Sequence, residues 1–126
     1  MSNPMDVYKK VEQDTLSGRE VEAAVLTKAA DKLQECQDNW ESPDRDQKLD
    51  ESIKFNQLVW SIFQSELASE DNPLPKDIRA NLLKLSAFID KRSLETMAYP
   101  AEEKLKVLID INRNIAAGLR ETPKAA

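Results

Sequence analysis

Glycine occurs only twice in this chain of 126 residues, and this scarcity constrains the fold more than any other feature of the sequence. Charged residues make up 33% of the chain, which exceeds the usual quarter. Leu, Ile, Val and Phe together form about a quarter of the residues, a level above that of typical disordered chains. A composition that is poor in glycine and rich in leucine and charge predicts an all-α fold.

The length and hydropathy of the chain predict one soluble domain that covers residues 1–126. No apolar run approaches the ~18 residues that a membrane-spanning helix requires. The first residues, Met1 to Asp6, have neither a basic leader nor the apolar stretch of a signal peptide. These features predict a cytoplasmic protein without a membrane-spanning segment.

Prolines and helix-capping residues divide the chain into segments with a helical apolar period. Ser17 and Glu20 have the spacing of a capping box, and Ser42 before Pro43 is typical of a cap with proline at the first helical position. The pattern predicts a short N-terminal helix at 4–15 and four longer helices at 18–38, 44–69, 76–98 and 101–119.

Short connections between long helices indicate antiparallel neighbours. The predicted architecture is therefore a single-domain antiparallel helical bundle of four long helices plus the short N-terminal helix. Residues 121–126 are polar, and we expect them to form a frayed tail.

The residue types argue against an enzyme and against a metal centre. The chain has no histidine, which removes the commonest general base and the commonest metal ligand. Its single cysteine, Cys36, lies on the apolar side of its segment, where a buried small hydrophobe is the favoured interpretation. No glycine-rich phosphate-binding motif is present. We therefore expect no catalytic residues, no cofactor and no metal.

The charge of the chain disfavours nucleic acid as a partner. The net charge is −5 and the isoelectric point is about 4.8, the wrong sign for a protein that grips phosphate through its overall field. Lys106, Arg113 and Arg120 recur every seven residues and form a basic stripe. A solvated helix face is the favoured interpretation of this stripe, and a contact with an acidic partner or RNA is the alternative.

Two segments carry apolar faces wider than a small bundle needs. On a helical wheel the apolar side chains between Leu49 and Leu67 span an arc of about 220°, and those between Leu105 and Leu119 span about 200°. A surface helix usually shows a stripe somewhat over ~100° wide. The segment 76–98 carries two apolar stripes on nearly opposite faces. This surplus predicts a surface that binds an amphipathic helix.

One asparagine lies near the middle of each wide apolar face, Asn56 on the first and Asn112 on the second. The first interpretation is a pair of core amides, bonded to each other or to a backbone carbonyl, since buried polar groups are nearly always hydrogen-bonded. The second is that both amides face a groove and bond to a bound peptide helix. Both interpretations require the two side chains to lie close together in the fold.

We expect the partner-binding surface to combine these amides with exposed apolar side chains from the wide faces and from the second stripe of segment 76–98. The candidate set is Phe55, Asn56, Leu58, Ile62, Leu83, Val107, Ile111 and Asn112.

Several short stretches occur in a specific order and spacing along nearly the whole chain. Examples are SGREVEAAVL at 17–26, WSIFQ at 60–64, DNPLP at 71–75, LLKLS at 82–86 and IDINRNIAAGLR at 109–120. In this order and spacing the chain resembles FlaF, the flagellar biosynthesis regulator of alphaproteobacteria.

This resemblance implies a non-enzymatic protein that is required for flagellin synthesis or secretion and for filament assembly. It implies that the protein binds a disordered amphipathic segment of flagellin as an export chaperone, and that it acts with an opposing FlbT-type regulator. The alternative function is post-transcriptional regulation of flagellin translation, either with the FlbT-type protein or directly on flagellin mRNA.

Overall fold

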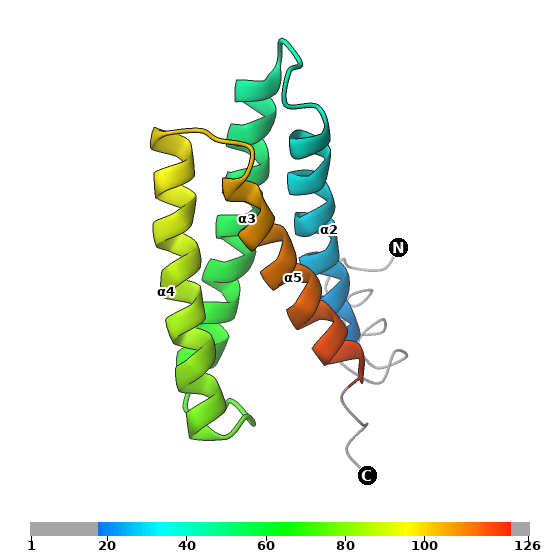
Figure 1. Ribbon diagram of the computed structural model, residues 1–126. Coiled ribbons are helices and arrows are strands. Elements are labelled where there is room, and N and C mark those ends of the chain that lie inside the picture. The colour runs from blue at the N-terminus through cyan, green and yellow to red at the C-terminus, as the bar shows by residue number, and fades with distance from the viewer. Residues whose placement is uncertain (1–17, 122–126) are drawn as a thin grey trace, which may run out of the picture.

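The computed structural model describes residues 18–121, and within this range it contains four α-helices and no strand. Figure 1 shows that the helices run alternately up and down, so consecutive helices are antiparallel. The all-α fold with four long helices is confirmed for this range, while the short helix expected at 4–15 lies outside the described residues. The helices are α2 (Gly18–Asp38), α3 (Arg45–Ala68), α4 (Lys76–Ala98) and α5 (Lys104–Glu121).

The expected start of α3 is wrong in its detail. Ser42 does not cap the helix with Pro43 at the first helical position, because α3 begins at Arg45 and Asp44 occupies the cap position. The Ser42 hydroxyl instead donates to Asp44 Oδ1 at 2.5 Å, and the Arg45 amide donates to the Ser42 carbonyl at 3.0 Å. Residues 39–44 therefore form a separate hydrogen-bonded turn between α2 and α3.

The start of α5 also lies later than predicted, at Lys104 instead of residue 101. The amides of Lys104, Leu105 and Lys106 donate to the carbonyls of Ala101, Glu102 and Glu103, three residues back in each case. Bonds of this span form a tighter turn than the α-helix. The acidic residues after Pro100 thus lie in a turn that leads into the helix. At its other end α5 includes Glu121, and 122–126 lie outside the described residues.

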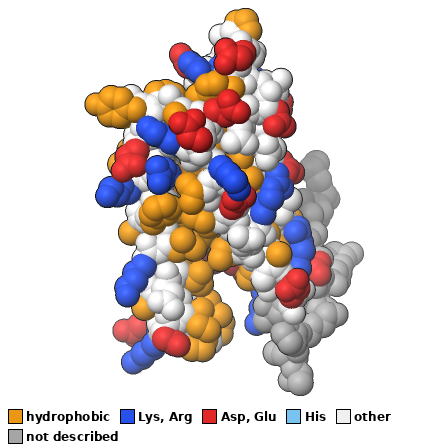
Figure 2. Space-filling model, viewed as in Figure 1, with side chains coloured by type: hydrophobic (Ala, Val, Ile, Leu, Met, Phe, Trp, Pro, Cys, Tyr) orange, Lys and Arg blue, Asp and Glu red, His pale blue; other side chains and the backbone are white. Residues whose placement is uncertain are grey.

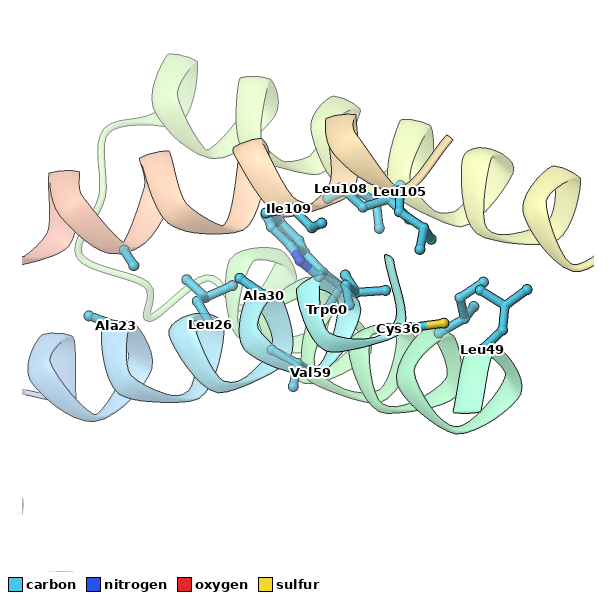
Figure 3. Packing of buried hydrophobic residues seen from close by; sticks show 14 residues of the cluster. Ala23, Leu26, Ala30, Cys36, Leu49, Val59, Trp60, Leu105, Leu108 and Ile109 are labelled. Carbon is cyan, nitrogen blue, oxygen red and sulfur yellow. The ribbon is translucent and has the colours of Figure 1, made fainter. Parts of the chain in front are cut away.

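The core lies mainly between α2, α3 and α5, and Figure 3 shows its buried side chains. The buried face of α2 is rich in alanine, which allows α5 to pack closely along it. Larger side chains from α3 and α5 fill the space between the three helices. The fully buried hydrophobic residues of α2 are Ala23, Leu26, Ala29, Ala30 and Leu33.

Helix α4 packs on α3 and touches α5 only weakly. Its buried residues are Ser86, Ile89, Ser93 and Thr96, so only one of them is a large hydrophobe. Gln64 of α3 donates from Nε2 to the hydroxyl of Ser86 and, at 3.0 Å, to Asp90 Oδ2. Small and polar side chains therefore form much of this interface.

A buried chain of three polar side chains joins α3 to α5. Trp60 Nε1 donates to Asn112 Oδ1 at 2.9 Å, and Asn112 Nδ2 donates to Asn56 Oδ1 at 2.6 Å. Trp60 is 1% exposed and both asparagines are fully buried. The predicted proximity of Asn56 and Asn112 is confirmed. The amides bond to each other in the core, as in the first interpretation, and do not face a groove.

We expect the change Asn112→Ala to destabilise the protein by about 3 kcal/mol, because it leaves the Trp60 N–H and the Asn56 carbonyl oxygen buried without a partner. The control Asn114→Ala makes the same substitution at an exposed position of α5 and is expected to change stability by less than ~0.5 kcal/mol. Urea denaturation followed by circular dichroism measures both values. Equal stability of the two variants would contradict a structural role for the buried chain.

Candidate functional site

At one end of the bundle, α2 and α5 diverge from α3 and α4 and leave an apolar groove. Figure 1 shows the divergence at the lower end, and Figure 2 shows the resulting notch with hydrophobic side chains on its wall. The cavity has a volume of about 400 Å³ and we refer to it as the end groove. Its apolar lining comes from all four helices and the loop 69–75: Leu26, Trp60, Phe63, Leu67, Pro73, Leu74, Leu82, Ile115 and Leu119.

Trp60 and Phe63 provide two aromatic rings that line the end groove from α3. Their ring centroids lie 5.7 Å apart with an angle of 82° between the planes, the edge-to-face arrangement that aromatic pairs favour. The polar group of Trp60, its indole N–H, already donates to Asn112. The indole is 1% exposed, so it forms the buried floor of the end groove and needs no polar partner there, while the partly buried Phe63 presents its ring to the cavity.

The loop 69–75 forms one wall of the end groove and is held by hydrogen bonds of Asn72. Asn72 Nδ2 donates to the Glu66 carbonyl at 3.0 Å, and Asn72 Oδ1 accepts from the Leu74 amide at 3.0 Å. Arg79 of α4 donates from Nη1 to the Ser69 carbonyl at 2.9 Å, which ties the loop to the next helix. These contacts satisfy backbone groups of the loop and position Leu74 in the lining.

The charged side chains that line the end groove are mostly acidic: Glu22, Glu66 and Asp71 lie there with one cation, Arg19. Their summed formal charge, three negative and one positive, is −2. The groove therefore combines an apolar interior with a negative rim. This arrangement can bind and orient a partner.

The structure divides the predicted contact residues into exposed and partly buried groups. Leu58 is 59% exposed and Ile62 is 51% exposed, on the side of α3 that faces away from the core. Phe55 is half-buried beneath Lys28 and Lys32, whose Nζ atoms lie 5.6 and 5.3 Å from its ring centroid.

The expectation of exposure fails for most of the other apolar candidates. Val107 and Ile111 are partly buried and pack against the core, and Leu83 is also partly buried. Much of the surplus apolar arc of α5 is thus used inside the bundle. None of the eight candidates belongs to the lining of the end groove, although Leu83 directly follows the lining residue Leu82 and Asn112 lies within one turn of the lining residue Ile115.

The residues that sequence reasoning missed lie at the diverging ends of the helices, for example Phe63, Leu82 and Leu119. Their apolar character and helical spacing were visible, but a helical wheel does not show where two helices separate along their length. One local signal was available: Leu74 is an isolated apolar residue between two prolines, in a loop that would otherwise favour polar side chains.

A second, more polar cavity of about 280 Å³ lies at the α2–α3 turn, with Cys36 in its lining. Cys36 is 4% exposed, and its burial raises the pKa of the thiol. The Ser52 side chain and the Arg45 guanidinium oppose this rise. Arg45 also stacks on Trp40, with its guanidinium carbon 4.5 Å from the ring centroid. The raised pKa keeps the thiol protonated and disfavours a nucleophilic role.

The basic stripe on α5 is largely paired within the protein. Lys106 Nζ lies 2.6 Å from Asp110 Oδ2, and Arg113 Nη1 lies 3.2 Å from Asp31 Oδ1 of α2. These pairs favour the interpretation of the stripe as a solvated helix face.

A family model described as flagellar protein FlaF matches residues 4–119. The chain belongs to the FlaF family. This match includes every residue that lines the end groove, so the groove is part of the FlaF-family region. The family is one of flagellar proteins and is not known as an enzyme family. No curated protein and no solved structure gives a significant match to the chain.

None of the helices in residues 18–121 is long and apolar enough to cross a membrane. Within the same range, no group of three or more acidic, cysteine or histidine side chains is placed to hold a metal ion.

We expect Cys36 of the native protein to react with the thiol reagent DTNB at least about 100-fold more slowly at pH 8 than in 6 M guanidinium, because burial limits access and raises the pKa. The rate at which native Cys36 reacts with DTNB should rise with pH only above the pH range in which an exposed thiol ionises. The Cys36→Ala, Ala117→Cys variant, with its thiol at an exposed α5 position, is the control. Equal native rates for the two thiols would contradict the buried assignment.

Proposed function

We propose that this FlaF-family protein binds flagellin through the end groove and supports flagellin export and filament assembly as a non-enzymatic chaperone. The observation that carries the proposal is a preformed apolar groove in the matched region of a flagellar protein. Its volume of about 400 Å³ lies in the range of cavities that hold ligands in proteins, ~300–1,000 Å³.

An amphipathic segment that is disordered before assembly is the kind of partner that such a groove suits. A helix can lay an apolar stripe into a groove with anchors at i, i+3, i+4 and i+7, and folding on binding provides reversible affinity. Covering the apolar stripe of flagellin in this way would prevent premature polymerisation. The protein can therefore act by shielding a surface, without a catalytic step.

Leu58 and Ile62 form a second exposed apolar surface, and both belong to the predicted set of partner-binding residues. It lies on the outer side of α3, whereas the end groove is enclosed by four helices and a loop. A concave site removes more of a ligand's surface from water than an outward-facing stripe does, so we assign the main contact to the end groove.

Regulation of flagellin translation, with an FlbT-type protein or directly on mRNA, is the alternative function. The net charge of −5 and the pairing of Lys106 and Arg113 give direct RNA binding little support. A flagellin chaperone can also influence flagellin levels indirectly, because it changes the amount of free flagellin in the cell.

We expect Leu82→Asp to weaken flagellin binding at least about tenfold, because it places a charge in the apolar lining of the end groove. Leu82 is a suitable site because it lines the groove but is not among the residues that pack against the core. Leu94→Asp is the matched control on the same helix, at a position that is 62% exposed and outside the groove. Co-elution with flagellin at micromolar concentration, followed by titration calorimetry, measures the effect.

Separate elution of the unmodified protein and flagellin would refute the chaperone proposal. A loss of binding in Leu58→Asp with full binding in Leu82→Asp would assign the contact to the outer side of α3 instead. Circular dichroism of each variant distinguishes lost binding from lost folding.

A further inference from the structure

The charged side chains at the end groove indicate the charge of its partner, which the apolar lining alone does not. Glu66 follows the aromatic pair on α3, and Asp71 lies in the loop wall that follows this helix. Both side chains are exposed, and among residues 18–121 neither carboxylate forms an ion pair. We refer to them as the rim carboxylates.

The rim carboxylates are attached to backbone that is held in place. The Glu66 carbonyl accepts hydrogen bonds from the Ser69 amide and from Asn72 Nδ2, and the Asp71 amide donates to Ser69 Oγ at 3.3 Å. Arg79 anchors the same loop from α4. Both negative charges are therefore kept at the edge of an apolar cavity before a partner arrives.

An apolar wall beside fixed charges strengthens their effect on a ligand, because low-dielectric surfaces focus the field into the cleft. We propose that the end groove selects an amphipathic helix whose apolar stripe is flanked by Lys or Arg side chains, which contact Glu66 and Asp71. This inference rests on the proposed function and specifies the charge of the segment that the groove accepts.

The same electrostatic argument disfavours a second copy of this chain as the occupant. Each copy has a net charge of −5, so two copies repel each other before any local contact forms. A basic segment instead gains from the rim carboxylates and from the overall field of the protein. Complementary charge of this kind contributes more to partner choice and association rate than to total affinity.

The test uses two designed 18-residue helices with the same leucine stripe and a fluorescent label. One carries Lys and the other carries Glu at the positions that flank the stripe. When each labelled helix is titrated with the 126-residue protein, its fluorescence anisotropy should give an affinity for the Lys helix that is on the order of tenfold higher in 50 mM salt, with a smaller preference at 500 mM.

The double variant Glu66→Lys, Asp71→Lys should reverse this preference. The control double variant Glu41→Lys, Glu103→Lys makes the same change in net charge at exposed positions outside the end groove, and it should retain most of the preference for the Lys helix.

Equal affinities for the two helices, or equal effects of the two double variants, would overturn the inference. Sedimentation of the protein alone as a dimer that Leu82→Asp dissociates and the Lys helix does not would also overturn it, because a second copy would then occupy the groove. If flagellin binds but the helices are not discriminated, only this inference fails. If the Lys helix is preferred but flagellin does not bind, only the proposed flagellin function fails.

Discussion

The hydrogen-bonded chain from Trp60 through Asn112 to Asn56 is the interaction on which the arrangement of the helices depends. It joins α3 to α5 at full burial, and each bond fixes the rotation of one helix relative to the other. Asn56 Nδ2 has no partner among the described residues, so the amide pair also has a cost in stability. A buried polar contact of this kind is best understood as a device that specifies one packing among several apolar alternatives.

The same chain lies directly beneath the end groove. Because the Trp60 N–H donates to Asn112 inside the core, the 1% exposed indole forms the floor of the groove without an unsatisfied polar group. Packing elsewhere in the bundle determines the groove's position. Helix α5 follows the alanine-rich face of α2, whereas α4 follows α3 through the small and polar side chains of their interface. The weak contact between α4 and α5 leaves their ends uncovered.

Much of the fold could be predicted from the sequence, because glycine scarcity, proline positions and apolar periodicity are local properties. The range of α2 and that of α4 agree with the prediction, and the proximity of Asn56 and Asn112 followed from their positions on the two wide faces. The predicted start of α3 at residue 44 is one residue from the observed Arg45, whereas that of α5 at residue 101 is three residues before Lys104. A tight turn precedes α5, and the hydrogen bonds of such turns have no strong signature in residue type.

The binding surface was harder to predict. An apolar arc on a helical wheel has the same width whether a third helix covers that face or leaves it exposed to solvent. Val107 and Ile111 widen the arc of α5, yet they pack against the core. Phe63 and Leu119 appear on the wheel as ordinary core positions, yet they line a cavity because their helices diverge at that level. Divergence depends on how all four helices pack together, which is a tertiary property.

The satisfaction of backbone groups explains how an apolar groove can exist without a partner in place. An open groove exposes hydrophobic side chains to water at a moderate cost, but an unpaired buried amide or carbonyl beside it would cost more. Asn72 removes this problem in the loop wall by bonding to the Glu66 carbonyl and the Leu74 amide. The backbone of Leu74 is thereby tied to Asn72 while its side chain lines the groove. A partner that enters the end groove therefore meets apolar side chains and the rim carboxylates, while the Glu66 carbonyl and the Leu74 amide of the wall are already paired within the protein.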